Sequence, residues 1–317
     1  MKLHRPEPIL RCDARPVRDI RRAADALLRG EPRLVTDRYG TAADVLEALA
    51  DRVDPTTRRF REVAAGLVAP IEDGRVLLHG ARNIGFLEDL YPELQAFWLP
   101  FIDIQGLSSA WERYRDGVKL AVVGREIRPF YGTYAPTRTE HLELFATWLS
   151  KYEGARGRAI DVGTGCGVLA MLLEKQGFAE VIATDTNPNA VESVRRQRLE
   201  RVQVREADLL DGEQADLVVF NPPWVRGEVR GLLDQALFYR DPALFERFFD
   251  QALSSSTVVM LFSNIQSLVL PDEPHPIEAE LARGRYRLVE KLRRKVKPPK
   301  GRRTKERVEV WVLAPLS

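Results

Sequence analysis

The chain falls into two regions that differ in how hydrophobic and polar positions repeat. Before about residue 130, helical patterns over 17–29, 42–50 and 56–65 precede two hydrophobic runs, 67–70 and 75–78, separated by Glu72-Asp73-Gly74. Hydrophobic runs on either side of a Gly-containing turn predict a β-hairpin. Three helices and a hairpin are the element order of a winged helix and also of plain packing modules, and both interpretations stay open.

The rest of this first region contains expected helices at 88–97 and 108–115 and expected strands at 118–123 and 126–130. The character of the pattern changes near Phe130. We therefore predict an accessory or substrate-recognition domain over residues 1–130 and a catalytic domain over residues 131–317.

From residue 131 onward, helical and strand patterns alternate. Strands are expected at 158–162, 180–184, 202–206, 216–220, 257–262, 286–295 and 307–313, and helices at 137–151, 166–176, 188–199, 242–253 and 277–282. This alternation predicts a doubly wound α/β fold, in which helices cover both faces of a mainly parallel sheet. The last strand is expected to be antiparallel.

Composition narrows the class of protein. Hydrophobic residues make up 44% and charged residues 30% of the 317 residues, and the 48 basic and 46 acidic residues nearly balance. No stretch has the roughly 18 apolar residues of a membrane span or the pattern of a signal peptide. Cys12 and Cys166 have no metal-ligand spacing. We expect a cytoplasmic protein without a metal site or a disulfide framework.

A glycine-rich turn, Asp161-Val162-Gly163-Thr164-Gly165-Cys166-Gly167, follows the first strand of the alternating region. Glycines let the backbone turn sharply and approach a ligand at the amino end of the next helix. A dinucleotide fingerprint needs Gly or Ala at position 168, where this chain has Val. The residues of this turn that we expect to bind a nucleotide-like cofactor are Asp161, Gly163, Thr164, Gly165 and Gly167.

Acidic residues follow the next two strands. Asp185, with Thr186 after it, stands where a carboxylate can accept both hydroxyls of a ribose. Asp208 and Leu209 follow the third strand, where a carboxylate can receive the amino group of an adenine. A single Asp in such a position is commonly a turn or helix-cap residue. Three acids after three consecutive strands indicate one cofactor site instead.

The fourth strand ends in Asn221-Pro222-Pro223-Trp224. The Asn221 side-chain oxygen and the Pro222 carbonyl can each accept a hydrogen bond from a planar amino or amide nitrogen, and Trp224 can stack on its plane. The two prolines stiffen the turn, so that the acceptors are held in place. An isolated Asn-Pro-Pro is more often a simple turn. At the end of this strand it predicts a site that orients a nitrogen for methyl transfer, with Asn221, Pro222, Pro223 and Trp224 as its residues.

Together, these motifs resemble those of class I S-adenosylmethionine-dependent methyltransferases with an Asn-Pro-Pro-aromatic signature. That group includes glutamine-amide methyltransferases of translation release factors and amino-group methyltransferases of RNA and DNA. The resemblance covers about residues 131–313, and residues 135–140 are similar to the Pro-Arg-Pro-x-Thr-Glu element of the release-factor enzymes, one residue shorter. It implies a seven-stranded, Rossmann-like sheet and S-adenosylmethionine as cofactor. It also implies roles for Gly163, Gly165 and Asp185 in holding the cofactor, for Asp208 at its adenine, and for Asn221 and Trp224 at the target nitrogen.

The segment 291–307 contains ten Lys or Arg residues and one acid, Glu306. Such a run is more commonly a solvated charged segment. If strands 286–295 and 307–313 pair, however, their connecting loop leaves the sheet at the edge that carries Asn221. We therefore expect four basic residues to contact phosphates of a nucleic acid, namely Arg226, Arg230, Arg302 and Arg303.

The target remains open among several classes. Methylation of a nucleic-acid base, with RNA favoured, would use both the Asn-Pro-Pro-Trp turn and the basic segment. Methylation of a glutamine amide in a translation protein would use the turn alone, and a small-molecule methyltransferase or a binding module without chemistry is also compatible with the motifs. A dehydrogenase is disfavoured by Val168. His141 and His275 are expected to be surface or structural residues.

Overall fold

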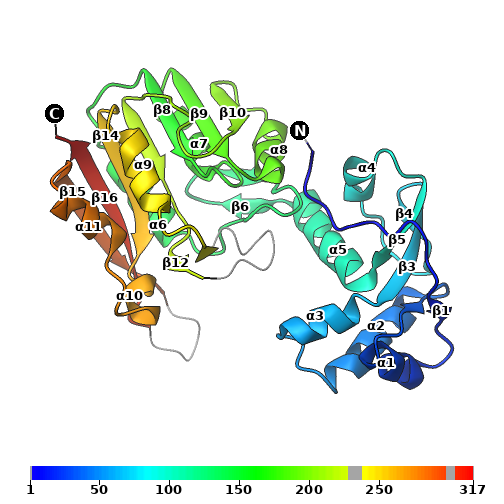
Figure 1. Cartoon of the computed structure of the whole chain (residues 1–317). Helices are drawn as coiled ribbons and strands as arrows, with labels where there is room; N and C mark the ends of the chain where they lie inside the picture. The colour runs from blue at the N-terminus through cyan, green and yellow to red at the C-terminus, as the bar shows by residue number, and fades with distance from the viewer. Residues whose placement is uncertain (1, 228–237, 298–303, 317) are drawn as a thin grey trace. The chain divides into compact units, whose positions relative to one another are not determined.

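The computed structural model describes residues 2–227, 238–297 and 304–316. It divides into two compact units, residues 3–115 and residues 116–317 together with the first two residues (Figure 1). The division lies earlier in the chain than the expected position near residue 130. The reason is that the hairpin following residue 116 contributes Leu120, Val123 and Ile127 to the hydrophobic core of the second unit.

The N-terminal unit combines short helices with a five-stranded mixed sheet. In chain order its elements are β1 (Arg15–Pro16), α1 (Ile20–Leu28), β2 (Arg33–Leu34), α2 (Tyr39–Ala50), α3 (Arg58–Ala64), β3 (Leu67–Glu72), β4 (Arg75–Val76), α4 (Phe86–Leu90), β5 (Ala96–Pro100) and α5 (Phe101–Asp116). The predicted three helices are present, and so is the predicted hairpin, β3–β4. Asp73 and Gly74 both have positive φ, 47° and 69°, as a tight hairpin turn requires. Because β1 and β2 join β3 in parallel, this hairpin belongs to a sheet larger than a two-stranded wing.

The predicted helix at 88–97 is confirmed only as far as Leu90 and is wrong beyond it. α4 ends at Leu90, and residues 96–100 form β5, which pairs antiparallel with β3. Phe97 and Leu99 are buried, whereas the alternate residues Ala96 and Trp98 are more exposed, so the period is that of a strand. Pairing with a strand far away in sequence thus outweighs the local helical pattern.

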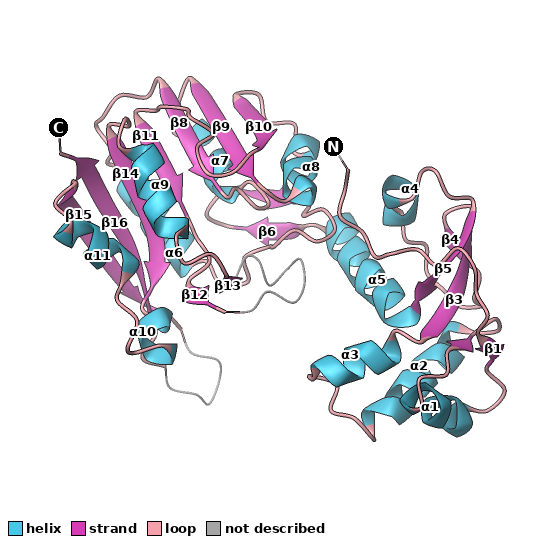
Figure 2. Ribbon diagram, in the orientation of Figure 1, coloured by secondary structure: helices cyan, strands magenta, loops and turns pink. Residues whose placement is uncertain are grey.

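The C-terminal unit is the doubly wound α/β domain that the sequence predicts (Figure 2). Its elements are β6 (Val118–Leu120), β7 (Arg125–Ile127), α6 (Glu140–Leu149), β8 (Arg158–Val162), α7 (Val168–Lys175), β9 (Glu180–Asp185), α8 (Pro188–Arg196), β10 (Val202–Glu206), β11 (Leu217–Phe220), β12 (Val225–Arg226), β13 (Phe238–Tyr239), α9 (Leu244–Ala252), β14 (Thr257–Ser263), α10 (Ile265–Val269), α11 (Pro276–Ala282), β15 (Tyr286–Lys295) and β16 (Arg307–Pro315). The predicted bounds of β8, β10 and β15 are confirmed to the residue.

The main sheet has seven strands in the order β10-β9-β8-β11-β14-β16-β15. The first five are parallel, and β16 is antiparallel to both of its neighbours, as expected for the last strand. The order reverses at β8, from which the chain runs outward to β9 and β10 and then returns to β11 on the other side. In an open α/β sheet, ligands bind beside the carboxyl ends of the strands at such a reversal.

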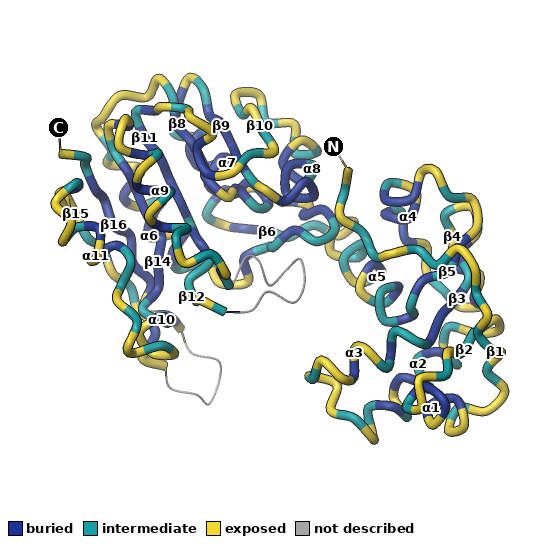
Figure 3. Tube along the Cα trace, viewed as in Figure 1, coloured by how far each residue is buried: buried dark blue, intermediate teal, exposed yellow. Residues whose placement is uncertain are grey.

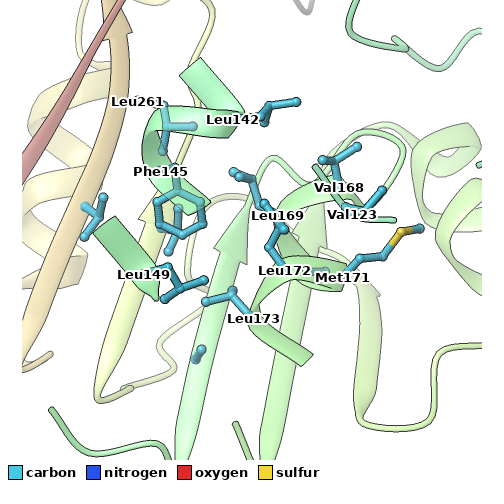
Figure 4. Close-up of a cluster of buried hydrophobic side chains, with 14 of the residues drawn as sticks. Val123, Leu142, Phe145, Leu149, Val168, Leu169, Met171, Leu172, Leu173 and Leu261 are labelled. Carbon is cyan, nitrogen blue, oxygen red and sulfur yellow. The ribbon is translucent and has the colours of Figure 1, made fainter. Parts of the chain in front are cut away.

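Alternate residues of each strand enter one of two hydrophobic cores on opposite faces of the sheet. Ala159, Leu217 and Val219 face a core formed with α6 and α7, part of which is shown in Figure 4. Ile160, Val218 and Phe220 face a second core, which is formed with α9 and α11. The central strands are therefore buried on both sides, as the dark segments of Figure 3 show. This rigid frame fixes the strand ends that carry the candidate site.

Within the described residues, no helix is both long and apolar enough to span a lipid bilayer.

Candidate active site

The carboxyl ends of β8, β9 and β11 and the loop after β10 border a cavity of about 240 Å³. Nearly every motif singled out in the sequence contributes to its wall. The lining residues are Gly132, Thr133, Tyr134, Pro136, His141, Leu142, Val162, Gly163, Thr164, Gly165, Cys166, Val168, Leu169, Asp185, Thr186, Asn187, Ala190, Ala207, Asp208, Leu209, Phe220, Asn221, Pro223 and Leu244. The glycine turn, both later acids and the Asn-Pro-Pro turn thus meet at one edge of the sheet.

The glycine turn has the backbone geometry that only glycine adopts at low cost. Gly163, Gly165 and Gly167 have φ values of 62°, 54° and 85°, all in the left-handed region. Gly167 is the N-cap of α7, and a Cβ there would lie 3.1 Å from Cγ2 of Val194. Glycine is therefore required at this position both by the backbone and by the close approach of α8.

Asp161 supports the turn from below and is not among the residues that line the cavity. Its Oδ2 accepts hydrogen bonds from the Thr164 hydroxyl at 2.7 Å and from the Ala170 main-chain N–H at 2.9 Å. Its side chain is fully buried, and this burial raises the pKa of the Asp161 carboxyl to about 7. Asp161 therefore supports the turn that borders the cavity, and its predicted part in holding the cofactor would act through Thr164 and Ala170.

Asp185 holds the end of β9 against the glycine turn. One carboxylate oxygen accepts a hydrogen bond from the Gly165 N–H at 2.9 Å and the other from the Asn187 N–H at 2.8 Å. Burial raises the pKa of Asp185 above its ordinary value, whereas these hydrogen bonds act in the opposite direction. Each carboxylate oxygen has accepting capacity left for a ligand hydroxyl.

The loop after β10 is tied to β9 as well. The Thr184 hydroxyl donates to the Leu209 carbonyl at 2.7 Å, and the Ala207 N–H donates to the Asp185 carbonyl at 3.0 Å. Leu209 has a positive φ of 57°, and it lines the cavity as predicted. These bonds hold Asp208 and Leu209, which are predicted to border an adenine, beside Asp185, which is predicted to bind a ribose.

Asp208 has a partner that sequence reasoning missed. Its carboxylate forms an ion pair with Arg247 of α9, and Arg247 also pairs with Asp241 at 2.8 Å. These ion pairs raise the pKa of the Arg247 guanidinium above its usual range. No sequence motif marks Arg247, since it reaches Asp208 only through the packing of α9 on the sheet. Asp208 thus lines the cavity while its carboxylate is paired with the Arg247 guanidinium.

The Asn221 side chain places a buried acceptor atom in a residue of the cavity wall. Its Oδ1 is buried and has no hydrogen-bond partner among the described residues, although Asn221 lines the cavity. A buried acceptor without a partner costs about 1–3 kcal/mol, so such atoms are rare unless a ligand satisfies them. Pro222 is buried and Pro223 lines the cavity, so the turn is fixed on both sides of the Pro-Pro bond.

Trp224 does not line the cavity, in contrast to the expected stacking wall. Its indole N–H donates to the Leu261 carbonyl at 3.3 Å, and the ring packs against the core beneath α9 and α11. Its ring also contacts the His141 ring edge to face, with centroids 5.3 Å apart and an interplanar angle of 86°. His141 does line the cavity and is buried, so of the two expected alternatives, a surface or a structural residue, the first is excluded. His275 accepts the Glu278 N–H as the N-cap of α11, which confirms a structural role.

The loop that connects β15 and β16 within the basic segment leaves and rejoins the sheet at the edge that carries Asn221, as predicted. Lys295 of β15 pairs with Arg307 of β16, and the next residue, Val308, pairs with Ser263 at the carboxyl end of β14. The Lys297 N–H donates to the Glu140 carboxylate at 3.1 Å, directly before His141 in the chain. The base of the segment is therefore anchored beside the cavity.

The predicted phosphate contacts can be compared with the structure only in part. Arg226 lies in β12, is exposed and has Glu273 3.3 Å away. Arg230, Arg302 and Arg303 lie outside the described residues. Among the residues that the structure describes, no group of three or more His, Cys, Asp or Glu side chains could hold a metal ion.

Comparison with known proteins points to one class of enzyme. Residues 141–243 match the family model described as "Methyltransferase small domain". A ribosomal protein L11 methyltransferase from Symbiobacterium thermophilum is 37% identical over 121 residues, which are 35% of this chain and 38% of that protein. A release factor glutamine methyltransferase from Bacillus subtilis is 30% identical over 154 residues, 41% of this chain and 52% of that protein. The chain thus spans about half or less of the length of these two relatives.

Among solved structures, a ribosomal protein L11 methylase from Lactobacillus delbrueckii subsp. bulgaricus aligns with a TM-score of 0.39 and 19% identity, over 58% of this chain and 81% of that one. The match of the family model extends from His141 through the glycine turn, both cavity acids and Asn221. The part of the chain that carries the cavity is therefore similar to S-adenosylmethionine-dependent methyltransferases, and this similarity implies S-adenosylmethionine as the cofactor.

Proposed function

We propose that the chain is an S-adenosylmethionine-dependent N-methyltransferase that acts on a planar nitrogen, in the favoured case an exocyclic amino group of an RNA base. The observation that carries the proposal is the buried Asn221 Oδ1, which has no described partner and belongs to the wall of the cofactor cavity. An acceptor held in this way matches the N–H of an amino or amide group.

The residues of the cavity fit this cofactor. Asp185 would accept the ribose hydroxyls, Asp208 and Leu209 would border the adenine, and the turn from Gly163 to Gly167 would approach the methionine part. When bound, the cofactor supplies a methyl group already activated by a sulfonium. Asn221 and the Pro222 carbonyl would then orient the accepting nitrogen, and orientation of this kind supplies a large part of many rate enhancements.

The RNA target is supported by the charge beside the cavity. Lys295, Lys297, Lys305 and Arg307, at the base of the basic segment, are exposed and form no ion pair with another described side chain. Unpaired cations that flank a pocket bind phosphates by releasing counterions, and such contacts position a nucleic acid without reading its sequence. The N-terminal unit would add recognition surface for the same substrate.

A second candidate function is methylation of a glutamine amide in a translation protein. It is favoured by the similarity to the release factor glutamine methyltransferase. A primary amide presents the same planar NH₂ group to Asn221 as a nucleobase does.

Transfer of a labelled methyl group decides between these targets. Purified protein and tritiated S-adenosylmethionine would be incubated separately with total RNA, DNA and ribosome-associated protein. We expect label in RNA, and at least about 100-fold less label with Asn221→Ala, since a positioned hydrogen-bonding group in a reaction site contributes roughly that factor. Label confined to protein would favour the second candidate. Absence of label from all three fractions, with an active control methyltransferase alongside, would contradict the proposal.

A further inference from the structure

Buried polar atoms without partners gather at the cavity. Eight side-chain atoms of the described residues are buried and lack a hydrogen-bond partner. Three of them belong to residues that line this one cavity, namely Oγ1 of Thr133, Nδ1 of His141 and Oδ1 of Asn221. Since each such atom is costly when left unsatisfied, their concentration marks positions that a ligand completes. Asn221 has a role in the proposed function, whereas His141 has none so far.

The position of the His141 ring is fixed by its surroundings. His141 lies in the first turn of α6, directly after Glu140, and its residue surface is 3% exposed. Its ring meets Trp224 edge to face, and Trp224 is itself held by the Leu261 carbonyl. The imidazole therefore stands between the fixed end of the Asn-Pro-Pro-Trp turn and the cavity.

The His141 imidazole is neutral under physiological conditions. Burial lowers its pKa from 6.5 to about 4, and the neighbouring Glu140 carboxylate offsets this only in part. A neutral imidazole offers one N–H donor and one acceptor, whereas the Asn221 oxygen can only accept. The wall thus carries a donor and an acceptor without placing a positive charge beside a sulfonium cofactor.

A planar amino group that belongs to adenine, cytosine or a primary amide has the complementary arrangement. Its N–H groups lie next to a ring nitrogen or a carbonyl oxygen that accepts a hydrogen bond. An alkyl amine has no such neighbouring acceptor. We infer that His141 is a specificity-determining residue, whose imidazole donates to the acceptor atom next to the target amino group while Asn221 accepts from the amino group itself. This inference rests on the proposed function and names the chemical feature by which the same site selects its substrate.

Two substitutions separate this role from simple packing. His141→Phe keeps a ring against Trp224 but removes both nitrogens, whereas His141→Gln keeps a donor but loses the ring. Transfer into total RNA would be measured for both variants, together with the affinity for S-adenosylhomocysteine by calorimetry and the melting temperature. We expect a loss of at least tenfold in kcat/KM with His141→Phe, a smaller loss with His141→Gln, and cofactor affinity within about threefold of the original protein.

A packing role predicts the reverse order, with His141→Phe the better enzyme, and that order or full activity of His141→Phe would overturn the inference. His275→Gln is the matched control, because the His275 side chain is also largely covered, at 11% exposed, but does not line the cavity. It should lower the melting temperature without changing kcat/KM. If label enters protein in place of RNA, the same series is run on that protein fraction, since a primary amide has the same neighbouring acceptor.

Nucleoside probes test the recognised atom directly. Adenosine and 1-deazaadenosine differ only in the ring nitrogen next to the amino group, and cytidine and 3-deazacytidine form the corresponding pair. In the transfer assay on RNA, one natural nucleoside should inhibit at least tenfold better than its deaza analogue, and His141→Phe should remove that preference. Equal inhibition by both members of both pairs, or a preference that persists in His141→Phe, would contradict the inference. An enzyme that binds S-adenosylhomocysteine but labels no acceptor would instead contradict the proposed function.

Discussion

The main-chain N–H of Gly165 donates a hydrogen bond to Oδ2 of Asp185 over 2.9 Å, so an acid of the cavity wall joins the first and second strands of the doubly wound domain at their carboxyl ends. The same carboxylate also accepts from Asn187 at the start of α8. One side chain therefore shapes the glycine turn and faces the cavity. Substitution of Asp185 should therefore change ligand binding, although Asp185 does not belong to the Asn-Pro-Pro-Trp turn.

Asp185→Asn should weaken the binding of S-adenosylhomocysteine by about 10- to 100-fold. Hydrogen bonds to a charged group contribute roughly 1.5–3 kcal/mol, and the new NH₂ group would face a main-chain donor. Isothermal calorimetry measures this change. Glu206→Gln is the matched control, because Glu206 ends the neighbouring strand β10, is exposed and does not line the cavity. Equal affinities of the two variants would rule out the role assigned to Asp185.

Alanine substitutions at two glycines compare the energetic cost of backbone strain with the additional cost of close packing. Gly167 and Gly177 have φ values of 85° and 87°, so alanine at either costs about 1–2 kcal/mol of backbone strain. A Cβ at Gly167 would also meet Val194 at 3.1 Å, whereas a Cβ at Gly177 has nothing within 4 Å. In urea unfolding we expect Gly167→Ala to lower the free energy of unfolding further than Gly177→Ala. Only Gly167→Ala should reduce cofactor affinity, and a similar loss in both variants would contradict the packing argument.

Asp161 should make the stability of the protein depend on pH. Its folded pKa of about 7 lies above the ordinary value of 3.8. Between about pH 4 and pH 7 the folded state therefore holds a proton that the unfolded chain has released, and the free energy of unfolding falls as pH rises, by up to about 1.4 kcal/mol per pH unit. His141, whose pKa is lowered, acts with the opposite sign between about pH 4 and 6.5.

The difference between Asp161→Asn and the original protein isolates the Asp161 contribution, because His141 is common to both. Asn retains an oxygen that can accept from Thr164 and Ala170 and does not ionise. In urea unfolding followed at several pH values, the stability of the variant relative to the original protein should rise from pH 4 to pH 7 and then level off. A difference that stays constant across this range would show that Asp161 is ionised throughout.

Arg247 should act on the cofactor through Asp208. Ion pairs between exposed groups contribute at most about 1 kcal/mol to stability, so Arg247→Gln should hardly change the melting temperature. Loss of the cation releases the Asp208 carboxylate from its position, and we expect S-adenosylhomocysteine to bind several-fold more weakly. Adding Arg247→Gln to Asp208→Asn should then have little further effect in calorimetry, because coupled residues are not additive. Full additivity of the two substitutions would indicate independent roles.

The doubly wound domain could be predicted from the sequence because its local patterns agree with its tertiary structure. β11 is a continuous hydrophobic run because both faces of this strand are buried. The turn between β3 and β4 contains Asp73 and Gly74, which are residue types that tight turns favour. The N-terminal unit was harder to predict, since β5 forms only through its pairing with β3. Contacts of that kind leave no local trace in the sequence.

The residues of the candidate site also form two groups, those whose position could be predicted from the sequence and those whose position could not. Gly163, Gly165, Asp185 and Asn221 line the cavity as predicted, because position after a strand suffices to place them. The places of Asp161, Trp224 and His141 depend on which way each side chain turns, and Arg247 approaches from a helix later in the chain. The positions of these four residues can be assigned only when burial and hydrogen bonds are known.

The most direct test of the account is calorimetry of the purified protein with three ligands. The account predicts that S-adenosylmethionine and S-adenosylhomocysteine each bind at one site per chain, that Asp185→Asn weakens both, and that NADH gives no heat of binding. Binding of NADH without any heat from either of the other two ligands would contradict it.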